Sequence, residues 1–227
     1  MRSVDAATDA DRTTRARIRD AAIAKFAEDG VAATSVRAIA AAAGVSPALV
    51  IHHFGSKDAL RVACDEHVAA VINEEKSGAM QSGVRLDPLA ALRAHEQRLP
   101  LLRYLARTLV DGSPHVAELV DQMVSDAATY MADGVTTGVL RPTAYPYERA
   151  AVLTVWSLGA LVLHEHLERL TGADLLRMPD DPAAAVAYVG PALEMLTEGV
   201  IDPQVAARVR AGFADDGPDT GKEEDHG

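Results

Sequence analysis

The chain has 227 residues, of which 48% are hydrophobic, so it is long and apolar enough to bury a sizeable core, and it carries a formal net charge of -11 at pH 7. The sequence contains no run of 18 or more apolar residues and no charged N-terminal region followed by an apolar signal core, so we expect no membrane partner and a cytoplasmic protein. A single cysteine, Cys64, excludes an internal disulfide and a cysteine-rich metal site.

Helical spacing of apolar residues dominates the chain and strand-like alternation is absent, so the sequence predicts an all-α fold. Residues 1–12 are polar, and we expect a flexible N-terminal arm there. A first helix is predicted from Thr13 or Thr14 to Asp29, because Gly30 is a typical C-terminal stop. Residues 13–56 are predicted to form a DNA-binding domain, residues 57–213 a helical body, and residues 214–227 a disordered acidic tail.

Two short helices follow, from Thr34 or Ser35 to Gly44 and from Ser46-Pro47 to near Phe54. Ser46 suits an N-cap, and proline at the first helical position loses no hydrogen bond. Helices this short must pack across a tight angle to be stable. The sequence therefore predicts a helix-turn-helix whose second helix enters the major groove of DNA.

The candidate DNA-binding residues are those expected on the outer side of this motif. Arg37 can reach a guanine edge or a phosphate, the hydroxyls can bond phosphates, and the apolar residues can touch thymine methyl groups. Either histidine could instead be a packing residue, and the lysine could be an ordinary surface residue. The full set is Thr34, Ser35, Arg37, Ser46, Pro47, Ala48, Leu49, Ile51, His52, His53 and Lys57.

The charge distribution agrees with this prediction. From Arg12 to Arg61 there are eight basic and four acidic residues, whereas from residue 62 onward there are 13 basic and 26 acidic residues. A DNA-binding head on an acidic body would show this division. Chance surface charge would also produce it.

The run TSVRAIAAAAGVSPALVIHHFGSKDAL resembles the N-terminal domain of TetR-family repressors. The resemblance covers about residues 14 to 62 and implies a three-helix DNA-binding head on a helical body that binds ligands and forms a homodimer. The family commonly has a tyrosine where this chain has Ile51, which favours an apolar base contact there. The block ALVIHHFGSKDALRVACDEHVA further resembles actinobacterial members that control ABC-type drug-efflux genes.

In the body, helices are predicted from Ser56 to Glu75 and at about 88–98, 100–110, 114–134, 147–171, 181–200 and 203–213. The segment Ala150–Leu163 is apolar nearly all round, and Ala183–Leu196 is a second apolar segment that contains Pro191. Such helices are buried on several sides, so we expect them to form the interface of a two-fold dimer.

A cavity for an effector is expected inside the body, lined by apolar and a few polar side chains. The candidates are Tyr104, Met123, Tyr130, Trp156 and His164, although methionine and aromatic residues at helical spacing are also what a helical core uses. The sequence HEHLE at 164–168 lacks HExxH spacing, and its two histidines point apart on a helix, so no metal site is predicted. No cofactor is expected.

The sequence shows neither a nucleophile-elbow motif nor a phosphate-binding glycine loop, so an enzyme is not predicted. We expect a ligand-responsive repressor that binds a pseudo-palindromic operator as a homodimer and is released by a small apolar effector, with a multidrug efflux transporter as a candidate target. A helical protein-binding adaptor without DNA function and a transcriptional activator of the same fold are the alternatives. Salt-dependent DNA affinity would separate the DNA-binding protein from the adaptor.

Overall fold

The computed structural model describes residues 2–82, 88–111, 114–176 and 182–215, which form helices and no strand. The predicted all-α class is confirmed. The helices are α1 (Arg2–Asp29), α2 (Val36–Ala43), α3 (Pro47–Phe54), α4 (Lys57–Gln81), α5 (Pro88–Leu109), α6 (Pro114–Thr136), α7 (Pro146–Val162), α8 (His164–Thr171), α9 (Pro182–Thr197) and α10 (Pro203–Asp215).

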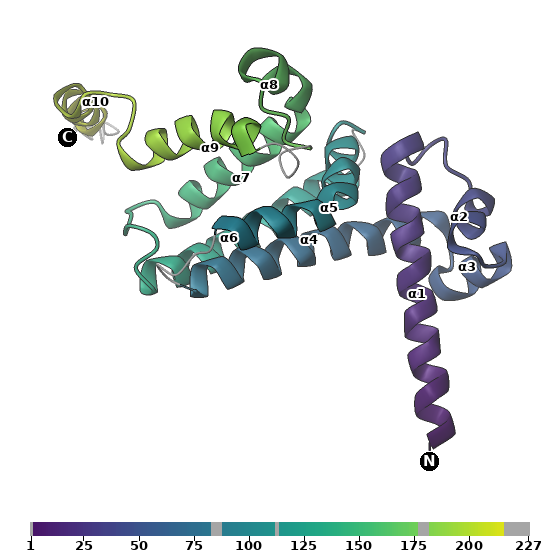
Figure 1. Cartoon of the computed structure of the whole chain (residues 1–227). Helices are drawn as coiled ribbons and strands as arrows, with labels where there is room; N and C mark the ends of the chain where they lie inside the picture. The colour runs from purple at the N-terminus through teal and green to yellow at the C-terminus, as the bar shows by residue number, and fades with distance from the viewer. Residues whose placement is uncertain (1, 83–87, 112–113, 177–181, 216–227) are drawn as a thin grey trace, which may run out of the picture.

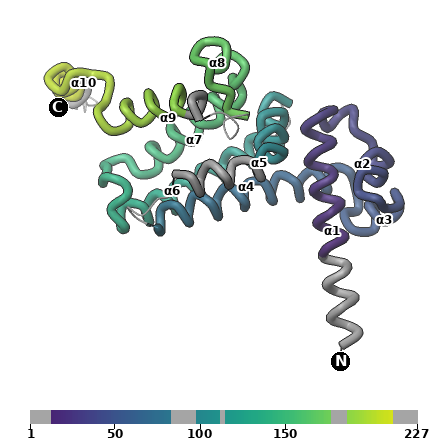
Figure 2. The backbone as a smooth tube through the Cα atoms, viewed as in Figure 1, coloured from purple at the N-terminus to yellow at the C-terminus, as the bar shows by residue number. Residues whose placement is uncertain are grey.

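The first three helices form a head at one end of the molecule (Figure 1). Helix α4 leads from this head into the body, where α6 packs along it and α7 packs against α6 (Figure 2). Helix α5 packs against α1 and thereby joins the body to the head. Helix α9 lies on the far side of α7 from α4, and α10 leaves the end of α9 that is distant from the head (Figure 1).

Several helix boundaries differ from those predicted. Helix α1 begins at Arg2, so residues 2–12, expected to be a flexible arm, belong to the first helix. Helix α4 continues to Gln81 rather than ending at Glu75. The predicted acidic tail lies outside the described residues from 216 onward, and α10 extends through Asp215.

Two predictions about helix continuity were wrong. Residues 88–109 form one helix, α5, with Pro100 inside it, because the apolar side chains around the proline pack into the core and offset its missing hydrogen bond. Residues 147–171 form two helices, α7 and α8, with a bend of 77° at Leu163. No glycine or proline marks this bend, and the apolar pattern continues through it, so the local signals do not reveal it.

No single helix in the described part of the chain is long and apolar enough to cross a membrane. Two bent pairs, α2 with α3 and α7 with α8, pass that test by length and composition only.

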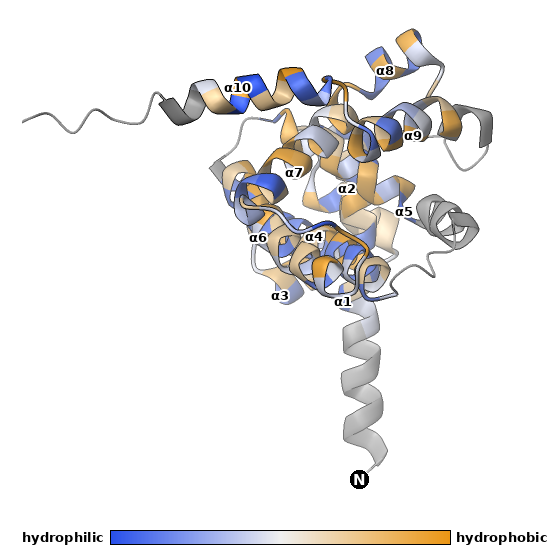
Figure 3. Ribbon diagram, turned by 90° about the vertical axis from the view of Figure 1, so that its left-hand side faces the viewer, coloured by the Kyte–Doolittle hydropathy of each residue, from blue (hydrophilic) through white to orange (hydrophobic). Residues whose placement is uncertain are grey.

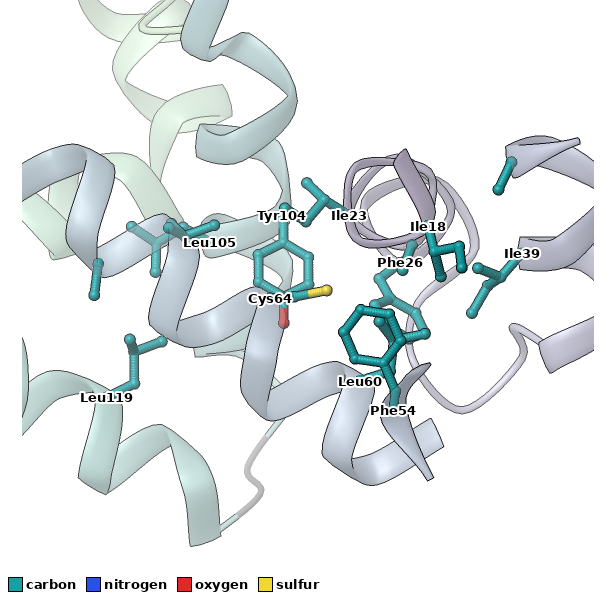
Figure 4. Packing of buried hydrophobic residues seen from close by; sticks show 14 of the residues in the cluster. Ile18, Ile23, Phe26, Ile39, Phe54, Leu60, Cys64, Tyr104, Leu105 and Leu119 are labelled. Carbon is teal, nitrogen blue, oxygen red and sulfur yellow. The ribbon is translucent and has the colours of Figure 1, made fainter. Parts of the chain in front are cut away.

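One hydrophobic core connects the head and the first half of the body. Ile18 and Phe26 of α1, Leu60 of α4 and Tyr104 of α5 are all buried (Figure 4). The rings of Phe26 and Tyr104 lie 6.2 Å apart between centroids, at a tilted angle typical of aromatic pairs. This packing holds α1, α4 and α5 together.

A polar pair lies inside this core. The hydroxyl of Tyr104 donates a hydrogen bond of 2.6 Å to Asp65 Oδ1 on α4. Burial raises the pKa of Asp65, although the bond from Tyr104 and the charge of Arg61 lower it. Burial also raises the pKa of Tyr104. The tyrosine therefore keeps its proton and donates a hydrogen bond to the buried Asp65 side chain.

Replacing Tyr104 with phenylalanine removes this donor and leaves a buried carboxylate oxygen unsatisfied. We expect Tyr104→Phe to lower the free energy of unfolding by about 1–3 kcal/mol, measured by urea denaturation. Tyr147→Phe removes the same atom from a residue that is 59% exposed and is the matched control, with no measurable effect expected. Equal effects of the two substitutions would contradict the structural role of the buried pair.

Candidate nucleic-acid interface and ligand cavity

Helices α2 and α3 form the predicted helix-turn-helix. The Ser35 hydroxyl accepts a hydrogen bond from the N–H of Ala38, and that of Ser46 accepts one from Leu49. Gly44 ends α2 at φ 65°, a left-handed conformation that favours glycine. The chain bends by 102° between the two helices, within the range of DNA-binding helix-turn-helix motifs.

Helix α3 has a buried face and an exposed face. Val50 and Phe54 are buried against the rest of the head. Ala48, Ile51 and His52 lie on the other side and are exposed, with Ile51 44% accessible. The structure therefore presents a mainly apolar surface, flanked by histidine, on the helix that the sequence predicts to enter the groove.

The other residues predicted to contact DNA differ in their exposure to solvent. Ser35, Arg37, Ser46 and Pro47 are exposed, and each serine hydroxyl keeps its proton free to donate while it caps a helix. Leu49 and His53 are half-buried. The rings of His52 and His53 lie 5.5 Å apart between centroids and meet edge to face.

Thr34 is not part of the exposed surface, which corrects its prediction as a phosphate contact. Its side chain is 2% exposed, and its hydroxyl donates to the carbonyl oxygens of Gly30 and Lys25. The residue closes the turn between α1 and α2 instead. Its position directly before the Ser35 cap made the two hydroxyls indistinguishable in the sequence.

Lys57 is half-buried and stabilises the head. Its ammonium group donates hydrogen bonds of 2.9 Å to the Val31 carbonyl and 3.1 Å to the Thr34 carbonyl. An ammonium group has three donors, so one is left for another acceptor. Lys57 therefore links α4 to the turn after α1, a role that the sequence analysis missed.

Arginines of α1 border the other side of α3. The Arg15 guanidinium lies 4.9 Å from the centre of the Phe54 ring, a cation–π contact. Arg15 and Arg19 line an open cavity of about 400 Å³ together with Phe54 and His67. Burial and the charge of Arg19 lower the pKa of His67. Acidic groups offset part of this positive charge, because Glu66 also lines the cavity and Arg19 forms an ion pair of 2.7 Å with Asp20.

A second cavity, of about 250 Å³, lies in the body between α4, α6 and α7, with one residue of α9 in its wall. Its wall is mainly apolar, with methionine side chains and a few polar groups. The lining residues are Ile72, Asn73, Lys76, Met80, Met123, Asp126, Tyr130, Met131, Ala150, Leu153, Thr154, Ser157, Leu158 and Leu196. This composition suits a small apolar molecule that also forms hydrogen bonds.

The structure brings two of the five predicted ligand residues, Met123 and Tyr130, to this cavity. Tyr104 is instead a fully buried core residue bonded to Asp65. Trp156 and His164 do not line the cavity either. The residues of α4 were missed because their contribution depends on how α4 lies beside α6, which spacing along one helix does not reveal.

Apolar side chains also lie on the outer surface of the body. Val152 and Val155 of α7 and Val186, Val189 and Leu193 of α9 are all exposed. Figure 3 shows the hydrophobic character of these two helices. Among the side chains that the structure describes, no group of three or more histidine, cysteine or acidic residues could hold a metal ion.

The head and the body of the chain each match a known protein family. Residues 18–64 match the family described as bacterial regulatory proteins, tetR family. Residues 96–202 match the family of tetracyclin repressor-like C-terminal domains. The chain is 40% identical over 197 residues to the HTH-type transcriptional regulatory protein RaaS of Mycobacterium tuberculosis. The aligned segment covers 85% of this chain and 89% of that protein.

Solved structures share the fold. A TetR-family regulator from Mesorhizobium loti aligns with a TM-score of 0.53 at 20% identity, over 79% of this chain and 97% of that one. NalD, the secondary repressor of the MexAB-OprM multidrug efflux pump in Pseudomonas aeruginosa, aligns with a TM-score of 0.50 at 23% identity, over 86% of this chain and 99% of that one. At these identities the likeness concerns the fold alone.

Proposed function

The chain belongs to the TetR family of bacterial transcriptional regulators, a family of non-enzymatic DNA-binding proteins, and from this premise we propose that it is a cytoplasmic repressor. It binds a pseudo-palindromic operator as a homodimer and is released by a small, mainly apolar effector. The observation that carries this proposal is the helix-turn-helix, in which α3 buries Val50 and Phe54 and exposes Ala48, Ile51 and His52.

The DNA contacts follow from this arrangement. Helix α3 lies in the major groove, where Ala48 and Ile51 touch thymine methyl groups and Arg37 reads a base edge. Ser35, Ser46 and the free donor of Lys57 bond phosphates around it. A dimer holds two such helices about 34 Å apart, at successive major grooves on one side of the duplex.

The effector binds in the body cavity and acts through its differential affinity for two shapes of the dimer. A ligand that favours a shape with the wrong head spacing by about 2.7 kcal/mol weakens operator binding a hundredfold. Operator DNA must then weaken effector binding by the same factor. The apolar lining and the hydroxyl and amide groups of Tyr130, Thr154 and Asn73 support a mainly apolar effector with some hydrogen-bonding capacity.

We further propose that the regulated gene encodes a multidrug efflux transporter. This proposal rests on the resemblance of residues 48–69 to regulators of ABC-type efflux genes and on an effector cavity suited to apolar compounds. NalD, which shares the fold, represses an efflux pump in its own organism.

Arg37→Ala tests base reading. We expect a loss of about 1–3 kcal/mol in operator affinity, with relaxed preference at a single base pair, measured by fluorescence anisotropy on operator variants. Arg103→Ala, an exposed arginine of α5, is the matched control. Equal losses on operator and unrelated DNA would refute base reading by Arg37, and operator affinity independent of salt would favour the adaptor.

Val155→Asp tests the dimer. Val155 is 59% exposed on α7, and we expect the charge to convert dimers into monomers in sedimentation velocity and to lower operator affinity. Val110→Asp, at a residue that is 62% exposed at the end of α5, should change neither. A native chain that is monomeric at micromolar concentration yet binds the operator fully would exclude the dimer.

Deletion of the gene that encodes this protein tests which gene it regulates and whether it represses or activates that gene. We expect higher transcription of a transporter gene whose promoter the purified protein binds, measured by RNA sequencing and footprinting. Lower transcription of the bound gene would indicate an activator. Binding only at promoters unrelated to transport would refute efflux control while leaving the repressor in place.

A further inference from the structure

Helix α6 carries a glycine one turn beyond the residues that line the body cavity. Tyr130 belongs to the lining, and Gly134 follows it four positions later, on the same face of the helix. Gly134 is helical, and the left-handed glycine at this end of α6 is Gly138, at φ 80°. The turn accounts for Gly138, whereas Gly134 needs another explanation, because glycine is a poor helix former.

The tip of Met80, near the end of α4, fills the space beside Gly134. A Cβ atom on Gly134 would lie 2.6 Å from Met80 Sδ and 3.2 Å from Leu140 Cδ1. The first distance is too short for two non-bonded atoms, so the Met80 thioether lies directly against the backbone of α6. Met80 also lines the cavity. The missing side chain of Gly134 therefore forms a notch that receives part of a cavity residue.

Hydrogen bonds hold α4 and α6 together at this notch. The Thr137 hydroxyl, just after α6, donates a bond of 2.7 Å to the Met80 carbonyl. The Leu140 N–H donates one of 2.9 Å to the Gly134 carbonyl, and the Leu140 side chain packs against the buried cluster that contains Met131. A methyl group on Gly134 would therefore displace the flexible tip of Met80 rather than the two backbones.

We propose that Gly134 is a positioning residue that sets the size limit of the effector, because its notch keeps the tip of Met80 out of the cavity. This inference rests on the proposed function, since it assumes that the effector occupies this cavity, and it adds which effectors fit. The space of about 250 Å³ thus depends on a contact behind the cavity wall as well as on the lining residues.

The lining also indicates the chemical class of the effector. It contains one basic and one acidic residue, Lys76 and Asp126, so its formal charge is zero. The hydroxyl groups of Tyr130, Thr154 and Ser157 supply hydrogen-bond donors and acceptors. A neutral molecule with an apolar chain and a hydroxyl group matches this wall, because burying a charge without a partner is costly. Primary alcohols are the simplest members of that class.

Displacement of phenylnaphthylamine, a neutral fluorescent dye, by primary alcohols from butanol to decanol tests the proposal on the full chain. Each methylene that enters the cavity should raise the affinity of the alcohol about fourfold. The affinity should stop rising once the alcohol fills the cavity, and the chain length at that point is the size limit. Asn73→Phe fills the cavity from α4 and should abolish dye binding, which assigns the dye to the cavity.

Substitutions on either side of the notch should move the size limit in opposite directions. Gly134→Ala should shorten it by about two carbons, because the thioether then occupies the end of the cavity, and Met80→Ala should lengthen it by about two carbons. With Met80→Ala already present, Gly134→Ala should have no further effect, because the side chain through which it acts is absent. Gly78→Ala is the matched control, since a Cβ there meets no atom within 4 Å.

The variants that lack Met80 decide the question even where Gly134→Ala alone fails to fold, because they lack the clashing thioether. An unchanged limit in Gly134→Ala, the same shortening with and without Met80, or dye binding that persists in Asn73→Phe would each overturn the proposal. Failure of every alcohol to bind the native chain would refute the effector cavity of the proposed function as well. A graded series with the same limit in all variants would refute this inference alone.

Discussion

Helix α4 belongs to both the head and the body, and its packing determines how the two are joined. Leu60, Cys64 and Val68 are fully buried in the core that α1 and α5 share, whereas Ile72 and Met80 further along the same helix line the body cavity. A helix of this length spans about 37 Å and is held by its own hydrogen bonds throughout. The ligand cavity and the DNA-binding head are therefore connected by one continuous rigid element.

A buried hydrogen bond, from Tyr104 of α5 to Asp65 of α4, fixes the register of α5 against α4. Arg61 Nε lies 3.9 Å from Asp65 Oδ2, and Arg61 Nη1 lies 3.7 Å from Asp111, distances too long for good hydrogen bonds. The pair of Arg61 with Asp65 lies within α4, and a buried ion pair contributes little net stability because its desolvation offsets the attraction. The hydrogen bond from Tyr104 acts on specificity instead: sliding α5 along α4 would separate Tyr104 from Asp65 and leave the buried carboxyl group without its donor.

The sequence predicts best what depends on neighbouring residues. Ser46, Pro47 and Gly44 determine caps and a turn within a few positions, so the helix-turn-helix follows from local chemistry. The continuity of α5 through Pro100, the bend at Leu163 and the burial of Thr34 depend on packing between distant segments. Most of the cavity lining was missed for the same reason, since residues from four helices meet there only in the folded chain.

An acidic protein can bind DNA because the electrostatic interaction is local. The segment 12–61 has four more basic than acidic residues, while the net charge of the whole chain is -11. At physiological salt, charges farther than about 8 Å are largely screened, so in the proposed complex the phosphates would interact with the basic side chains of the head, such as Lys57, rather than with the acidic body. The acidic body nevertheless repels DNA that approaches from other directions. Under the proposed function, this division of charge would favour contact through the head over non-specific attachment of the body to DNA.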